Sequence, residues 1–168
     1  MKTLFEHLNE SMLCETNSQP NDKTKLIEDF CKQCGIKKYT INNDLTIDCY
    51  SPVVLSNYSK ERLPNYIKFK SVMGGFYIDG CPQLKSLKGC PKEVTGVFDC
   101  SGCRKIISLE GAPSIVDGDF YCNDCPKLES LKGVPKGVGG NFYCDNCGEQ
   151  FTEDDVKKYC KVKGRISV

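Results

Sequence analysis

Apolar residues recur along the middle of the chain at a fixed interval of 22 residues. Phe76, Phe98, Phe120 and Phe142 are in register. The other apolar columns keep the same interval: Leu84, Ile106 and Leu128; Leu87, Leu109 and Leu131; Val94, Val116 and Val138. One such unit cannot bury its apolar edge alone, whereas stacked neighbours share a continuous core. The pattern therefore predicts a solenoid of repeated coils.

Each repeat contains one segment with the alternation of a β-strand. Phe120, Cys122 and Cys125 alternate with the more polar Tyr121 and Asn123, as in a strand with one buried face. Glycine and proline columns further along the repeat mark the turn at the far side of the coil. Stacking in equal register places identical side chains above one another at about the 4.8 Å strand spacing. We expect one curved parallel sheet with the phenylalanines and cysteines inside.

The first 37 residues have the pattern of a helical cap. Thr3, with a glutamate three residues later, has capping-box spacing at the start of an amphipathic segment. Asn21 or Asp22 can cap a second helix that ends at Gly35. We expect residues 1–37 to cover the N-terminal end of the solenoid, which would otherwise expose its core.

Residues 38–73 predict a hairpin followed by an irregular first coil. The polar run at 42–44 lies between short β-prone segments and is typical of a hairpin turn. The interval from Val53 to Phe76 is 23 residues rather than 22. The regular repeats then occupy residues 74–147.

Residues 148–168 predict a C-terminal cap. Thr152 and Asp155 repeat the capping-box spacing, which indicates a helix that extends to about Cys160. The expected fold is therefore an α/β solenoid with a helix at each end.

Composition places the chain among globular proteins. Hydrophobic residues make up 39% and charged residues 27%, and the formal net charge is +1, which provides no general attraction to nucleic acid or anionic membranes. The apolar runs are too short to cross a bilayer, and the first fifteen residues lack the apolar core of a signal peptide. We expect a cytoplasmic protein whose thirteen cysteines are thiols or metal ligands rather than disulfides.

Cysteines in pairs raise the question of zinc. The repeats carry Cys-x-x-Cys at Cys100 and Cys103, Cys122 and Cys125, and Cys144 and Cys147. This motif is a common half of a zinc site, and Cys31 with Cys34 could add ligands. Both cysteines of each repeat pair also fall at inward positions of the coil, where a free thiol packs as a small hydrophobe. We expect packing and no metal or other cofactor, although zinc at Cys31 and Cys34 or at Cys144 and Cys147 stays open.

Catalytic groups do not stand out. The single histidine, His7, has no partner suggested by the sequence, and no glycine-rich phosphate loop follows a strand. No acid–base pair can be singled out among the scattered carboxylates. We expect a protein that is not an enzyme.

The stretch FYCNDCPKL resembles the strand signature of the leucine-rich-repeat family. Phe120 and Cys122 take its inward leucine positions, and Cys125 takes the Asn/Cys ladder position, whose side chain bonds exposed backbone. The phrase SLEGAP…GDFYC looks like the short repeats of phage-encoded and giant-virus proteins. The resemblance implies a leucine-rich-repeat-like fold and a phage protein that inhibits or modulates a host enzyme, such as the ATP-dependent protease Lon or a defence enzyme, in the host cytoplasm.

Outward positions of the strands form the candidate binding face. We expect this concave face to bind a host protein through Tyr77, Asp79, Asp99, Tyr121, Asn123, Tyr143 and Asp145. Tyrosine is enriched at interfaces, and solenoid faces commonly bind partners. Basic residues instead follow the return segments of the coils: Lys85, Lys88, Lys92, Arg104, Lys105, Lys127, Lys132 and Lys136. We expect no small-molecule substrate, membrane or nucleic acid as a partner.

The alternative function is a zinc-stabilised nucleic-acid-binding protein that uses the basic side. A structural component of a virion is a third possibility that the sequence leaves open. The identity of the partner and the oligomeric state do not follow from the sequence.

Overall fold

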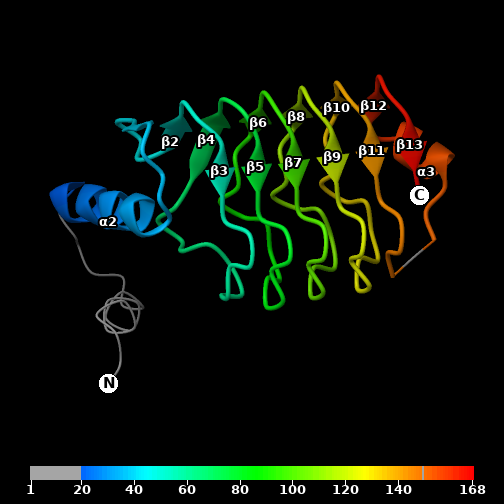
Figure 1. Ribbon diagram of the computed structural model, residues 1–168, viewed down its shortest axis with the longest axis horizontal. Coiled ribbons are helices and arrows are strands. Elements are labelled where there is room, and N and C mark those ends of the chain that lie inside the picture. Colours follow the sequence, from blue (N-terminus) through cyan, green and yellow to red (C-terminus); the bar gives the residue numbers. More distant parts are fainter. Residues whose placement is uncertain (1–19, 149) are drawn as a thin grey trace.

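The protein is a β-solenoid of stacked parallel coils (Figure 1). The computed structural model describes residues 20–148 and 150–168. Each regular coil contributes two short strands that follow one another around a corner, so that two sheets run side by side along the stack (Figure 1). The predicted solenoid is therefore confirmed.

Two sheets are present where the sequence pattern led us to expect one. The seven-stranded sheet contains β1 (Tyr39–Ile41), β2 (Ile47–Cys49), β4 (Phe69–Val72), β6 (Glu93–Val94), β8 (Ile115–Val116), β10 (Gly137–Val138) and β12 (Lys161–Val162). The six-stranded sheet contains β3 (Val53–Val54), β5 (Phe76–Tyr77), β7 (Phe98–Asp99), β9 (Phe120–Tyr121), β11 (Phe142–Tyr143) and β13 (Ile166–Ser167). The valine column, which we assigned to a return segment, forms most of the additional sheet. Because every column repeats at the same interval, any extended segment of one coil meets its copy in the next and pairs with it.

Parallel pairing in register builds a continuous core. Phe76, Phe98, Phe120 and Phe142 pair with one another along the six-stranded sheet and are fully buried. Their rings are stacked with centroids 5.2 to 5.8 Å apart. The valines of the seven-stranded sheet pair in the same way on the other side of the core. Burying a side chain of this size contributes roughly 1.5–3 kcal/mol relative to leaving it exposed.

Glycines form the corner between the two sheets. The backbone N–H of Gly96 donates to the carbonyl of Gly74, and Gly118 and Gly140 continue the series at 2.9 to 3.0 Å. A Cβ on Gly118 would lie 2.6 Å from the carbonyl carbon of Gly96. The coils approach so closely at this corner that only glycine fits.

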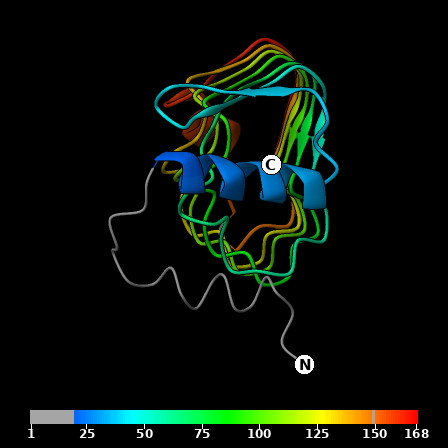
Figure 2. The same cartoon turned by 90° about the vertical axis from the view of Figure 1, so that its left-hand side faces the viewer.

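Helix α2 (Pro20–Gln33) lies across the N-terminal end of the coils (Figure 2). Its Ile27, Phe30 and Cys31 are buried in the solenoid core. The helix begins at Pro20, which suits a first helical position because proline has no N–H to leave unpaired. The prediction that Asn21 or Asp22 is the N-cap is therefore wrong, since both lie within the first turn. The helix ends before Gly35, as predicted, where φ is 68°.

Strands β1 and β2 form the predicted hairpin. Tyr39 pairs with Cys49 in antiparallel orientation, and the turn lies at residues 42–46. Leu45 adopts a left-handed conformation in this turn with φ of 61°. The expected irregular first coil is confirmed, because Val53 pairs with Phe76 at an interval of 23 residues.

The C-terminal segment does more than cap the stack. Helix α3 (Glu153–Lys157) begins with the predicted capping box of Thr152 and Asp155 but ends at Lys157, before Cys160. After it, β12 and β13 add a further strand to each sheet, with Ile166 paired to Phe142. The short helix is thus an insertion that lengthens the last coil to 24 residues between these partners. The first predicted helix and His7 lie outside the described residues.

The glycine corner generates a prediction for stability. Gly118→Ala should lower the free energy of unfolding by about 1–3 kcal/mol, because its Cβ would push two coils apart. Gly137→Ala is the control, since a Cβ at Gly137 meets nothing within 4 Å, and its effect should stay within about 1 kcal/mol. Urea unfolding followed by circular dichroism measures both variants. Equal effects of the two substitutions would contradict the close approach of coils at the corner.

Candidate functional site

The outward face of the six-stranded sheet carries all seven residues predicted to bind a partner. One column follows the phenylalanines and contains Val54, Tyr77, Asp99, Tyr121 and Tyr143, which are paired in register. A second column lies two residues further along each coil and contains Ser56, Asp79, Ser101, Asn123 and Asp145. Backbone bonds between successive coils at the adjacent positions keep this second column aligned. The structure thus places the predicted residues on one continuous surface, which we call the tyrosine–aspartate face.

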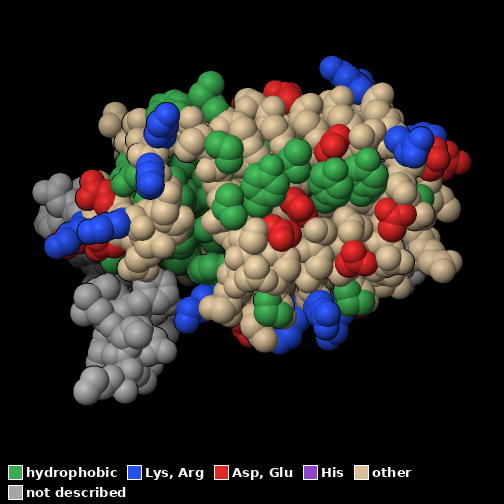
Figure 3. Space-filling model, in the orientation of Figure 1, with side chains coloured by type: hydrophobic (Ala, Val, Ile, Leu, Met, Phe, Trp, Pro, Cys, Tyr) green, Lys and Arg blue, Asp and Glu red, His purple; other side chains and the backbone are tan. Residues whose placement is uncertain are grey.

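Two tyrosines form an aromatic stack on this face. The rings of Tyr121 and Tyr143 have centroids 4.6 Å apart and planes inclined by 9°. The hydroxyl of Tyr121 donates to Oδ2 of Asp119 at 3.3 Å. Partial burial and the nearby Asp119 carboxylate raise the pKa of Tyr121 above its ordinary value, so the phenol stays neutral. Figure 3 shows a band of hydrophobic side chains across this side of the molecule, with acidic groups beside it.

Serine hydroxyls hold the aspartates of the face in place. Ser101 Oγ donates to Oδ1 of Asp99 at 2.6 Å, and the backbone N–H of Ser101 donates to the same atom. Ser167 Oγ donates to Oδ1 of Asp145 at 2.7 Å, and Ser56 bonds Asp79 in the same manner. Sequence analysis missed these serines, because two of the pairs bridge neighbouring coils at intervals of 22 and 23 residues. Each of these bonds engages Oδ1 of its aspartate.

A ladder of thiols lines the inner edge of the bend after each strand of the six-stranded sheet. The Sγ atoms of Cys103, Cys125 and Cys147 donate to the carbonyls of the residues 25 positions earlier at 3.2 to 3.5 Å. These acceptors are the carbonyls of Ile78, Cys100 and Cys122. Each acceptor directly follows a strand, where the ladder of backbone bonds between coils has ended. The predicted ladder role of Cys125 is confirmed.

The ladder gives the repeated cysteines a packing role without a metal. Burial raises the pKa of Cys122 and Cys125 to about 12, so both remain thiols near neutral pH, whereas zinc binds thiolates. Within residues 20–148 and 150–168, no group of three or more His, Cys, Asp or Glu side chains could hold a metal ion.

The two cysteine pairs left open for zinc lie far apart. Cys144 and Cys147 have Sγ atoms 3.5 Å apart and follow β11, near one end of the stack. Cys31 and Cys34 belong to α2, at the opposite end (Figure 1). The four thiols therefore cannot join in one tetrahedral site.

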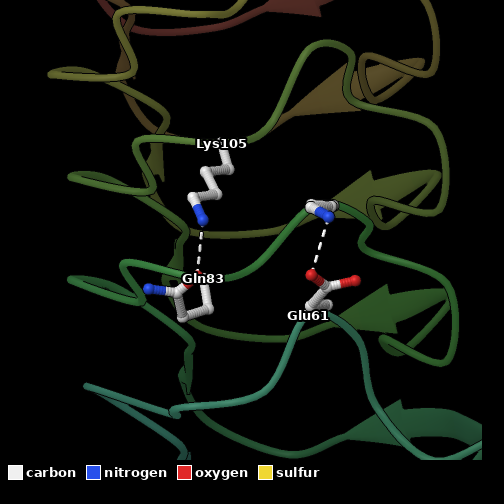
Figure 4. Close-up of polar contacts among 4 residues, drawn as sticks. Glu61, Gln83 and Lys105 are labelled. Carbon is white, nitrogen blue, oxygen red and sulfur yellow. Dashed lines mark hydrogen bonds and ion pairs between the residues drawn. The ribbon is translucent and has the colours of Figure 1, made fainter.

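Basic side chains follow the return segments, as the sequence indicated. Lys105 Nζ donates to Oε1 of Gln83 in the preceding coil, and Glu61 forms a 2.7 Å ion pair with Lys85 (Figure 4). Lys132 bonds Glu110 at 2.9 Å across the next pair of coils. Such exposed pairs contribute little to stability, typically about 0–1 kcal/mol.

The chain matches no protein-family model, no curated protein and no solved structure. Among the described helices, none is both long enough and apolar enough to cross a membrane. The chemistry of the protein's own surface is therefore the basis for a functional assignment.

The thiol ladder predicts a marked difference between two core substitutions. Phe120→Ala should lower the free energy of unfolding by about 3–5 kcal/mol, because it removes a fully buried ring from the stack. Cys125→Ser should cost clearly less, since the hydroxyl keeps a donor for the Cys100 carbonyl. Denaturant titration of both variants provides the comparison. If a chelator unfolds the unmodified protein before either substitution does, a metal holds the coils and the packing interpretation is wrong.

Proposed function

We propose that this protein is a non-enzymatic binding module that docks a partner protein through the tyrosine–aspartate face. The stacked pair of Tyr121 and Tyr143 carries the proposal, because it places two large rings side by side on the outer side of a sheet. Neither ring is needed to fill the core, which the phenylalanines on the inner side already occupy. Aromatic side chains of this kind are enriched at protein interfaces and among the residues that dominate binding energy.

The arrangement of the face suits a partner with a basic or mixed surface. Stacking holds the two rings in one orientation, so little side-chain freedom remains to be lost on binding. Asp99 and Asp145 flank the stack, and each engages one carboxylate oxygen with a serine. Oδ2 of each aspartate can then accept from a cation or an N–H of the partner. The acidic flank also favours fast encounter with a basic surface.

The resemblance to short leucine-rich repeats extends the proposal to a biological setting. The protein acts as a phage-encoded factor that binds a host enzyme in the host cytoplasm and inhibits or modulates it without chemistry. An ATP-dependent protease such as Lon, or a defence enzyme, is the target class. The repeat motif supports this setting, while the tyrosine–aspartate face supports the binding itself.

Removing the aromatic stack tests the binding face. A Tyr121→Ala/Tyr143→Ala variant should lose capture of the partner from a bacterial lysate, because truncating an interface anchor typically costs at least about 2 kcal/mol. Its circular dichroism spectrum should match that of the unmodified protein. Tyr159→Ala is the control, since Tyr159 is 58% exposed and lies beside α3, outside the face. Capture at full strength by the double variant would place the interface elsewhere on the molecule.

Removing the acidic charges tests the role of the flank. Asp99→Asn and Asp145→Asn keep Oδ1 as an acceptor for the serines while they remove two negative charges. The double variant should associate with the captured partner more slowly and with weaker salt dependence, while the dissociation rate changes little. Surface plasmon resonance at several salt concentrations measures both rates. Glu129→Gln with Asp154→Asn removes the same charge elsewhere, and an equal slowing by this control would show only a bulk charge effect.

A further inference from the structure

A cavity of about 650 Å³ lies at the N-terminal end of the solenoid. It is formed by α2, the turn of the β1–β2 hairpin and the segment 58–68 of the irregular first coil. Its size falls within the range of sites that hold small organic ligands, about 300–1,000 Å³. The tyrosine–aspartate face does not include it, so the two surfaces can be tested separately.

Apolar and aromatic side chains form one wall of the cavity. Ile27 and Leu63 are buried, and Leu45, Tyr58 and Tyr66 are half-buried and pack against the core. A ring placed on this wall would contact two tyrosines and three aliphatic side chains. The cavity therefore offers a preformed apolar surface for the body of a ligand.

Two local departures from regular structure place side chains in this wall. Leu45 lies in the cavity wall although its φ of 61° belongs to the left-handed region, where glycine or asparagine is unstrained. Tyr58 lies one coil below Cys81, with its backbone N–H 3.1 Å from the Cys81 Sγ, so it occupies the column that carries a thiol in every later coil. Strained backbone that persists is typical of functional sites. The cavity occurs where the repeat is broken.

Positive charge dominates the rim. Lys23, Lys60, Arg62 and Lys68 line the cavity, together with two carboxylates, those of Asp44 and Glu61. Both carboxylates are engaged close by. Glu61 forms the ion pair with Lys85, and Oδ1 of Asp44 accepts from the backbone N–H and the hydroxyl of Thr46. A ligand therefore meets an apolar wall below a cationic rim.

We propose that this cavity binds a small organic anion whose aromatic or apolar body rests on the tyrosine wall. Arg62 and Lys68 hold its phosphate, sulfonate or carboxylate group. The planar guanidinium of Arg62 provides paired donors for two oxygens of such a group, and the ammonium of Lys68 adds a compact charge. The site binds a ligand without chemical conversion, and it is additional to the proposed docking of a partner protein.

Fluorescence titration with 8-anilinonaphthalene-1-sulfonate, an aromatic anion, tests the proposal. We expect a saturable enhancement with one probe bound per chain, and weaker binding as salt rises. Arg62→Glu/Lys68→Glu should weaken the affinity at least about tenfold, which corresponds to about 1.4 kcal/mol. Tyr66→Ala should weaken it through loss of the wall. Urea unfolding of each variant shows that the coils remain folded.

Matched controls separate the site from bulk effects. Lys127→Glu/Lys136→Glu makes the same change of charge on the regular coils and should leave probe affinity unchanged. Adenosine monophosphate should displace the probe at lower concentration than inorganic phosphate, because only the nucleotide has a ring for the wall. Absence of saturable binding, equal weakening by the control variant, or equal displacement by inorganic phosphate would each overturn the proposal.

Discussion

Backbone hydrogen bonds between equivalent positions of successive coils impose a common length on the regular coils, and the rest of the structure depends on this constraint. The N–H of Phe98 donates to the carbonyl of Asp119, and that of Phe120 donates to Asn141 one coil further on. A coil one residue longer would shift its strand out of register and turn buried side chains toward solvent. The 22-residue interval is therefore a geometric requirement, and each column of identical residues is its consequence.

Different columns meet this constraint with different chemistry. Inside the sheet, phenylalanine rings stack at about the separation of the coils. At the corner, glycines allow backbone to approach backbone. At the bend, cysteine thiols bond carbonyls that the strands no longer serve. Since neighbouring coils interact mainly with each other, stability accumulates along the stack, and the outer columns are free to vary from coil to coil.

Sites for recognition arise where this repetition is exposed or interrupted. On the tyrosine–aspartate face, the coil translation brings Tyr121 and Tyr143 into contact although they are 22 residues apart in the chain. At the N-terminal end, the longer first coil and the hairpin turn leave a cavity that regular coils do not form. The proposed partner site therefore uses the regularity of the solenoid, and the proposed ligand site uses its departure from regularity.

The sequence by itself determined the solenoid, the inward positions, the hairpin, the capping box of α3 and the outward residues of the binding face. These features follow from periodicity and local chemistry, which neighbouring residues express directly. Only the tertiary structure decided that the valine column forms a second sheet, since two-residue strands have no recognisable local pattern. It also decided that Ser167 supports Asp145, that the chain returns to both sheets after α3, and that a cavity opens beside α2. Each of these depends on contacts between distant segments, which the coil geometry creates and no local pattern encodes.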